Sequence, residues 1–208
     1  VVVDCGSFEE TGSARLSDLV VTALVCAAAL LLDQCLGEPR RWHPVVGFGN
    51  LAAGLERRLN CAPRHGIGRG LLAVLLLLAP LTLLAWLVVH LVPSWLVPAL
   101  EALGLWLALS LRGLREHGLA VAEPLERQDL TGARRAVGAI VSRNAERLDE
   151  SGVARAATES MLENGADAVF ASLFWFLVAG LPGVVLHRMA NTLDAMWGYR
   201  NERFLAFG

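Results

Sequence analysis

The apolar positions of this chain gather in a few long runs that charged residues rarely interrupt. Residues 70–100 contain no Asp, Glu, Lys or Arg, and Glu101 is the single formal charge over 71–111. A helix needs about 20 apolar residues to cross a bilayer, so this run is long enough for two crossings. We therefore expect one span near 70–92 and another near 95–111. The residues that favour a turn between them are Pro93, Ser94 and Pro98.

Two further apolar runs flank this pair. Residues 19–32 are 14 uncharged positions, a short run that either tilts its ends outward or lies partly buried in protein. The chain before it is acidic and lacks the basic start of a secretory signal, so we expect this run to be retained. Residues 168–186 are uncharged, but glycine and proline at 180–183 interrupt them. We favour a re-entrant or in-plane segment there over a full crossing, which would separate the polar motifs on either side.

The polar stretches between these runs define the topology. Residues 33–69 carry six Arg against three acidic residues, which by the positive-inside rule places them in the cytoplasm. Residues 112–167 carry apolar positions at helical spacing, and the two predicted crossings return them to the same side. Turn signals occur there at Glu123-Pro124 and Glu150-Ser151-Gly152.

The predicted class is all-α, a polytopic helical membrane protein with amphipathic cytoplasmic helices. The expected organisation is an N-terminal extension at 1–18, membrane helices over 19–111 with a cytoplasmic loop at 33–69, a cytoplasmic helical segment at 112–167, and a broken apolar helix with a polar motif at 168–208.

Composition narrows the possible functions. Apolar residues make up 55% of the 208 positions and charged residues 18%, while 18 Arg and 20 acidic residues leave a net charge of −2, which disfavours a nucleic-acid partner. The chain contains no Lys, which excludes a Walker A loop and a Schiff-base lysine. The four cysteines have no CxxC spacing, so we expect free, reduced thiols at Cys5, Cys26, Cys35 and Cys61.

The sharpest candidate site is a set of charged residues spaced by four, which places Arg155, Glu159, Glu163 and Asp167 along one helix face. Arg155 can pair with Glu159, but the other two carboxylates have no basic residue within four positions. Unpaired carboxylates at a membrane edge favour a Mg²⁺ or substrate-amine site, with Asn164 as a neutral hydrogen-bonding group. The alternative is a solvated helix face.

A second cluster follows the first apolar run and contains Asp33, Gly37-Glu38-Pro39 and Trp42-His43-Pro44. Its Gly and Pro residues predict a loop at the membrane surface, in which His43 is held away from a helix and is available to a ligand. The alternative is an ordinary helix-ending turn in which Trp42 lies at the interface.

A third cluster lies at 191–203, after the broken apolar run. Amides, carboxylates and arginines together are typical of a site for a polyanionic, amide-rich ligand. The alternative is an amphipathic C-terminal helix with surface ion pairs. The candidate binding residues are Asn191, Asp194, Tyr199, Arg200, Asn201 and Glu202.

Taken in order, the segments 32–56, 159–183 and 187–208 resemble the CobD/CbiB family, the membrane-bound adenosylcobinamide-phosphate synthases of cobalamin biosynthesis. The resemblance implies an ATP- and Mg²⁺-dependent ligase that joins a corrinoid carboxylate, in adenosylcobyric acid, to the amine of aminopropanol phosphate or a related amino-alcohol phosphate. It also implies a multi-pass protein of the cytoplasmic (inner) membrane whose polar motifs face the cytoplasm. Its partners would be these two substrates, the lipid bilayer and possible other corrinoid-assembly enzymes.

For each of the three clusters, the resemblance favours the functional interpretation over the structural alternative. It implies that Mg²⁺ is held by Glu159, Glu163 and Asp167, with Asn164 and His43 also catalytic, and that His43 or a carboxylate removes a proton from the attacking amine. It implies substrate binding by Asp33, Glu38, Arg155 and the residues of the third cluster. Without Lys, phosphate would be met by backbone N–H groups and by arginines, for which the candidates are Arg143, Arg155, Arg188 and Arg200.

The chain departs from the family pattern at several positions. The usual Gly-Asp-Pro is Gly37-Glu38-Pro39, the usual Arg-Asp-Thr is Arg143-Asn144-Ala145, and the usual Asp-Gly and Ala-Pro-Leu-Phe are Asp167-Ala168 and Ala171-Ser172-Leu173-Phe174. Family members continue beyond the length of this chain, so we expect it to be truncated at its C-terminal end. The second departure and the truncation favour the alternative function, a non-catalytic membrane scaffold or sensor, or a degenerate paralogue.

Overall fold

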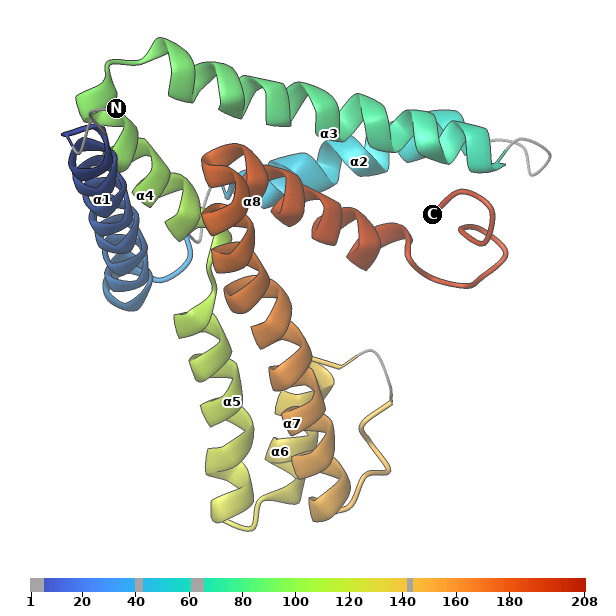
Figure 1. The fold of residues 1–208 in the computed structure, drawn as a ribbon. Coiled ribbons are helices and arrows are strands. Elements are labelled where there is room, and N and C mark those ends of the chain that lie inside the picture. The colour runs from blue at the N-terminus through green and yellow to red at the C-terminus, as the bar shows by residue number, and fades with distance from the viewer. Residues whose placement is uncertain (1–5, 40–42, 61–65, 142–143) are drawn as a thin grey trace.

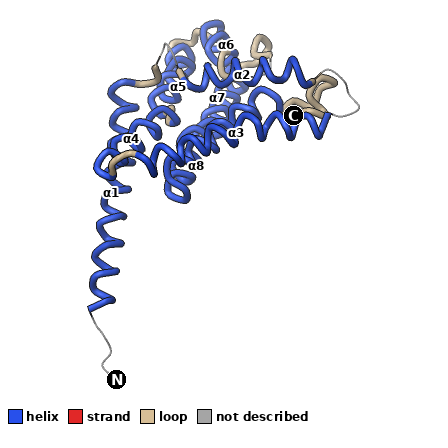
Figure 2. Tube along the Cα trace, turned by 90° about the horizontal axis from the view of Figure 1, so that it is seen from above, coloured by secondary structure: helices blue, strands red, loops and turns tan. Residues whose placement is uncertain are grey.

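The computed structural model describes residues 6–39, 43–60, 66–141 and 144–208, and within these ranges every regular element is a helix (Figures 1 and 2). The all-α prediction is confirmed. The elements are α1 (Gly6–Leu36), α2 (Pro44–Leu59), α3 (Gly66–Leu91), the 3₁₀ turn η2 (Ser94–Leu96), α4 (Val97–Ala108), α5 (Leu111–Glu126), α6 (Leu130–Gly138), α7 (Glu150–Gly165), the π-helical segment η3 (Ala166–Ala171) and α8 (Ser172–Trp197).

Four helical stretches in the described residues are long and apolar enough to cross a membrane. Many large apolar side chains on them remain exposed, among them Leu24, Leu75 and Phe170. A protein in water would bury such side chains, whereas hydrocarbon accommodates them, so the fold is that of a polytopic helical membrane protein. The four stretches are Leu16–Leu36, Gly66–Leu91, Ser94–Glu126 and Glu150–Trp197.

The predicted spans correspond to these helices with altered boundaries. Helix α1 begins at Gly6 and crosses the expected boundary at residue 18, and its N-terminal part projects from the rest of the molecule (Figure 2). Helix α4 has 12 residues, about 18 Å, so the stretch that contains it continues past a break at Leu109 and Ser110 into α5.

The expected turn at Glu123-Pro124 is wrong in its position. Pro124 lies inside α5, which ends two residues later at Glu126. A proline in the last turn removes a single helix hydrogen bond, and the packing of Leu125 on the α6 and α7 core offsets that loss. The signal at residues 150–152 marks a helix start, where the Asp149 carboxylate accepts the Gly152 N–H at 2.8 Å.

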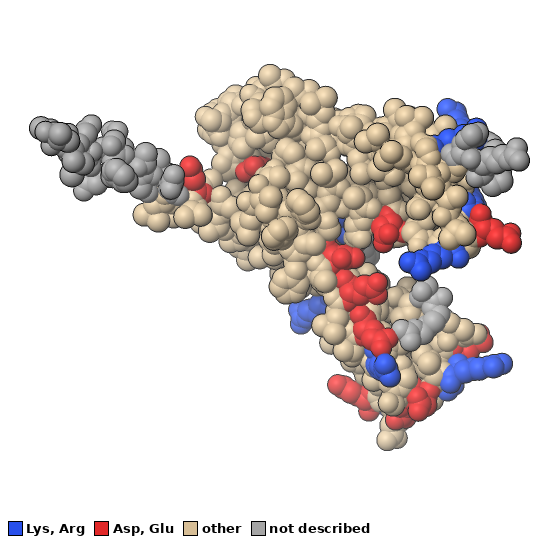
Figure 3. Space-filling model, turned by 45° about the vertical axis from the view of Figure 1, so that its right-hand side comes forward, with Lys and Arg blue, Asp and Glu red and all other residues tan. Residues whose placement is uncertain are grey.

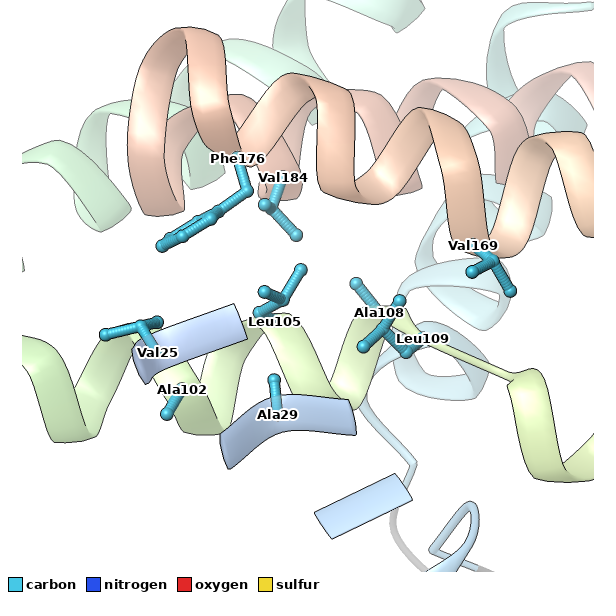
Figure 4. Packing of buried hydrophobic residues seen from close by; sticks show 9 residues of the cluster. All are labelled: Val25, Ala29, Ala102, Leu105, Ala108, Leu109, Val169, Phe176 and Val184. Carbon is cyan, nitrogen blue, oxygen red and sulfur yellow. The ribbon is translucent and has the colours of Figure 1, made fainter. Parts of the chain in front are cut away.

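Three hydrophobic clusters hold the helices together. In the first, small residues, among them Ala29 of α1 and Ala102 of α4, allow close approach of these two helices below Phe176 and Val184 of α8 (Figure 4). The second joins α2, α3 and the end of α8 through Phe48, Ala52, Ala73, Leu77, Leu193, Trp197 and Phe207. The third lies among α5, α6 and α7, which extend away from the other helices as a separate group (Figure 1).

Helix α8 reverses direction within its apolar run. Ala179 and Gly180 have non-helical backbone angles, and Gly180 has a positive φ of 58° that favours glycine. The second half of α8 returns along α3 and α2 (Figure 1). The break expected at 180–183 is therefore present, and it brings the residues around Asn191 back beside α7.

Candidate functional site

Two adjoining cavities lie where the α5–α7 group meets α8. They measure about 400 and 380 Å³. Because both are lined by Ile140, Val141, Ser160 and Asn164, we treat them as two halves of one cleft. We name the halves after their charged residues, the Arg188 half and the acidic half.

The acidic half is lined by residues of the first and the third sequence clusters. Glu159 and Glu163 of α7 and Asp167 of η3 face Asn191 and Asp194 of α8 across it. Figure 3 shows the row of acidic side chains along the edge of the hollow between the α5–α7 group and the rest of the molecule. These residues line one cavity because α8 reverses at Gly180, which brings residues that are far apart in the sequence close together in space.

The helix changes its winding within the acidic stripe. Helix α7 ends at Gly165, and Asp167 lies in the π-helical turn that follows. The carbonyl oxygen of Asp167 lies 3.0 Å from His187 Nε2, which therefore donates to it and ties η3 to the returning half of α8. Wide turns of this kind often occur at functional sites, since they redirect side chains from the regular helix face.

The side chains of this half differ in what they already contact. Glu159 accepts from Arg155 Nε at 2.9 Å, which confirms the expected pair. The Asn164 amide donates to the Ser160 carbonyl at 2.8 Å, and the Ser160 hydroxyl donates to the Ile140 carbonyl. Among the described residues, no arginine forms an ion pair with the remaining three carboxylates, which are Glu163, Asp167 and Asp194.

These carboxylates do not form a closed metal cage. Within the described residues, no three His, Cys, Asp or Glu side chains converge on a metal position. Mg²⁺, however, commonly uses one or two protein carboxylates and completes its octahedron with phosphate oxygens and water. The acidic half therefore fits a Mg²⁺ ion shared with a phosphate ligand and does not fit an ion held by Glu159, Glu163 and Asp167 alone.

The Arg188 half contains a cation and several neutral polar groups. Arg188 comes from the returning part of α8, and its Nε is buried with no hydrogen-bond partner among the described residues. The carboxylates of Glu38 and Asp167 are the charges that act on it. Ser110, which precedes α5, and His117 of α5 line the same cavity. Among the arginine candidates that the structure describes, which are Arg155, Arg188 and Arg200, only Arg188 lines the cleft.

His43 lies near the same charges but has a structural task. Its Nδ1 accepts the Val45 N–H at 3.2 Å and caps α2. Burial holds the pKa of His43 below its ordinary value; the nearby Glu38 carboxylate opposes this effect and the Arg188 guanidinium adds to it. A neutral imidazole that accepts at Nδ1 carries its proton on Nε2. His43 is therefore arranged to donate a hydrogen bond and not to remove a proton.

Asp33, which was expected to bind substrate, makes a structural contact in the protein interior. Its side chain is completely buried, and Oδ2 accepts the backbone N–H of Arg112 at 2.8 Å near the start of α5. The Arg112 guanidinium in turn donates to the carbonyl of Cys35 at the end of α1. Asp33 thus joins the end of α1 to the start of α5 and does not face the cleft.

The C-terminal part of the third cluster lies outside the cleft. Tyr199, Arg200 and Glu202 are exposed, and the side-chain Oδ1 of Asn201 accepts the backbone N–H groups of Arg203 and Phe204. Asn201 therefore stabilises a turn. Among the candidate binding residues of this cluster, all of which the structure describes, only Asn191 and Asp194 line the cleft.

Some sequence expectations fall on residues that are not described, namely Trp42, Arg143, Cys5 and Cys61. Cys26 and Cys35 are free thiols, as expected. Sequence reasoning missed Ser110 and His117. Together with Leu114 they follow i, i+4, i+7 spacing, which puts Leu114 and His117 on one face of α5 and Ser110 just before its start, and this periodicity is the signal that could have found them.

The fold and the cleft define the class as an all-helical, polytopic membrane protein with a charged cleft beside a helix that reverses direction. The sequence profile of the family described as CobD/Cbib protein matches residues 26–208, and the chain belongs to this family.

Relatives named "Cobalamin biosynthesis protein CobD" agree with this assignment. The protein from Stutzerimonas stutzeri (strain A1501) is 61% identical over 86% of this chain and 59% of its own length. The Chromobacterium violaceum protein is 53% identical over 90% of this chain and 61% of its own length. The chain thus spans about three fifths of these relatives. No solved structure matches it significantly.

Proposed function

We propose that the intact protein is the adenosylcobinamide-phosphate synthase of cobalamin assembly. In this reaction a corrinoid carboxylate of adenosylcobyric acid forms an amide with the amine of an amino-alcohol phosphate, at the expense of ATP. The observation that carries the proposal is a cleft in which unpaired carboxylates stand beside a partly buried arginine, in a chain of the CobD/CbiB family.

The cleft supplies the groups that such a ligation needs. A carboxylate is a poor acyl donor until it is phosphorylated, and Mg²⁺, when bound, would neutralise phosphate charge during that transfer. One or two of the carboxylates of Glu163, Asp167 and Asp194, which line the acidic half, would hold the ion together with phosphate oxygens. Arg188 meets phosphate through its fork of N–H donors. A carboxylate of the acidic half, and not His43, takes the proton from the attacking amine.

The proposed location is the inner membrane, with the cleft open to the cytoplasm. Residues 33–69, which contain α2 and so are not the continuous loop expected from the sequence, carry six Arg against three acidic residues, which supports a cytoplasmic position. The second cluster of hydrophobic residues packs α2 against the end of α8, so the polar motifs at both positions share one side. Other corrinoid-assembly enzymes could reach substrates on that side.

Asn144 and Ala145 replace the family's usual Asp-Thr, a departure that favours a non-catalytic scaffold, but neither residue belongs to the cleft. Ala145 is buried in the core of the α5–α7 group, and the side-chain Oδ1 of Asn144 accepts the Glu146 N–H at 2.9 Å. Neither residue lines the acidic half or the Arg188 half. This placement supports the enzyme over the scaffold.

Complementation tests the proposal. A strain that lacks this synthase is fed cobyric acid and receives the intact protein, and corrinoid products are identified by mass spectrometry. We expect growth and formation of adenosylcobinamide phosphate that requires ATP and Mg²⁺. Normal membrane insertion without growth or product would overturn the proposal and favour the scaffold or sensor.

A further inference from the structure

The two halves of the cleft carry opposite charge. Among the described residues that line it, the acidic half contains four carboxylates and no arginine. The described lining of the Arg188 half contains one arginine and no carboxylate. Because the halves share Ser160 and Asn164, a single small ligand can extend from one to the other. A ligand with an anionic end and a cationic end matches this arrangement.

The state of Arg188 indicates what the anionic end is. Its Nε is buried without a partner, and the guanidinium forms no ion pair among the described residues. A partly desolvated guanidinium without a partner is costly, and a tetrahedral oxyanion offers it two parallel charge-assisted hydrogen bonds. The Ser110 hydroxyl makes no capping bond to α5 and lines the same cavity, as does the His117 ring. These groups are typical of a phosphate site.

We propose that the Arg188 half binds the phosphate group of a ligand whose cationic part lies in the acidic half, and this inference rests on the proposed function. Two ligands of the reaction have this chemistry: the amino-alcohol phosphate, with phosphate and ammonium, and the nucleotide, with phosphate and Mg²⁺. Each half of about 400 or 380 Å³ suits a small phosphate ester better than a corrinoid macrocycle. The corrinoid therefore presents its carboxylate from outside.

The two halves are coupled by charge. Asp167 lines the acidic half and also acts electrostatically on Arg188. A cation bound in the acidic half neutralises carboxylates that would otherwise repel an incoming phosphate. Ligands that carry both charges should therefore bind much better than ligands that carry one.

Equilibrium binding to the intact protein in nanodiscs tests the inference without turnover. The probes are aminopropanol phosphate, unphosphorylated aminopropanol, and a non-hydrolysable ATP analogue with Mg²⁺. We expect Arg188→Gln to weaken binding of a phosphate-bearing probe by about tenfold to a hundredfold and to leave unphosphorylated aminopropanol unaffected. Arg188→Lys, which keeps the charge but loses the fork, should give an intermediate loss. The matched control is Arg127→Gln, at an exposed arginine paired with Glu123, which should change no affinity.

The arms of the experiment separate the outcomes. Weaker binding of aminopropanol phosphate alone would show that the phosphate group of the amine substrate occupies this site. Weaker binding of the ATP analogue alone would show that a phosphate group of the nucleotide occupies it. The inference is overturned if wild-type protein binds no phosphate-bearing probe, if Arg188→Gln weakens neither, or if it weakens unphosphorylated aminopropanol equally. Should Arg188→Gln fail to fold by size exclusion, Arg188→Lys supplies the comparison. Binding without product in wild type would reject the ligase function and leave the phosphate site standing.

Discussion

The carboxylate of Glu101 lies against the backbone of Gly180, where α8 reverses. A Cβ atom at Gly180 would lie 3.1 Å from Glu101 Oε1, and the Leu181 backbone N–H interacts with the same carboxylate. The first N–H groups of a helix lack partners within it, and hydrocarbon supplies none. The single charge over 71–111 thus stabilises the start of the returning half of α8, which explains why an apolar run contains a carboxylate.

Substitution of Gly180 by Ala should destabilise the fold by about 1–3 kcal/mol, because φ 58° and ψ −149° are accessible almost only to glycine. The free energy of unfolding can be measured by titration with SDS in mixed micelles. The control is Gly54→Ala in α2, where a Cβ meets nothing within 4 Å. It should leave stability unchanged or raise it by about 0.5–1 kcal/mol. Equal effects of the two substitutions would contradict the special backbone of residue 180.

The interaction of the Leu181 N–H with the Glu101 carboxylate predicts different effects for two substitutions of Glu101. Glu101→Gln keeps a carbonyl acceptor and should retain most of the stability, whereas Glu101→Leu leaves the Leu181 N–H unpaired and should cost about 1–3 kcal/mol. The same SDS titration measures both. If Leu proves as stable as Gln, the carboxylate does not support the reversal.

The parts of this structure that could be predicted depend on local signals. Apolar runs and the glycine–proline break at 180–183 act within a few residues, so the helices and the reversal follow from the sequence. The buried role of Asp33 does not, because its partner Arg112 is 79 positions away and is brought near only by packing of α1 on α5. For the same reason an amide such as Asn201 cannot be distinguished from a ligand-binding amide until its backbone partners are known.

Glu163→Gln in the intact protein should lower ligase turnover at least about 100-fold and change the free energy of unfolding by less than about 0.5 kcal/mol. The carboxylate lines the acidic half and forms no ion pair with an arginine among the described residues, so its loss removes a ligand-binding charge without breaking a contact. Corrinoid product formation measures the rate. The exposed Glu123→Gln is the control. Normal turnover by Glu163→Gln would show that the stripe is a solvated face.

Positions 45 and 199 should be accessible from the same side of the membrane. Helix α2 packs on the returning half of α8, and a Cβ at Gly49 would lie 3.6 Å from the Met196 sulfur. Cysteines introduced singly at Val45 and Tyr199, in a background without native cysteines, can be labelled in oriented vesicles with a membrane-impermeant maleimide. Labelling of the two from opposite faces would contradict the re-entrant arrangement.

The contact between Glu56 and Arg203 predicts an acid-sensitive stability. The Glu56 side chain is 4% exposed, and its oxygens accept from Arg203 Nη2 at 2.6 Å and Nε at 3.0 Å and from Asn60 Nδ2 at 2.8 Å. The bonds from Arg203 are the largest influence, and they hold the pKa of Glu56 below its ordinary value of 4.5 although burial opposes them. The pair thereby anchors the C-terminal segment to α2.

Because the folded-state pKa of Glu56 is the lower one, only the unfolded chain binds a proton at this site between the two pKa values. The stabilisation is therefore fully present above about pH 4.5 and is lost as the pH falls through the folded-state value. Glu56→Gln should lower stability at neutral pH, and its difference from wild type should shrink in acid. Unfolding titrations from about pH 7 to about pH 3 measure this, with exposed Glu123→Gln as the control. A difference that stays constant down to the lowest pH would show that the Glu56 carboxylate gains nothing from Arg203.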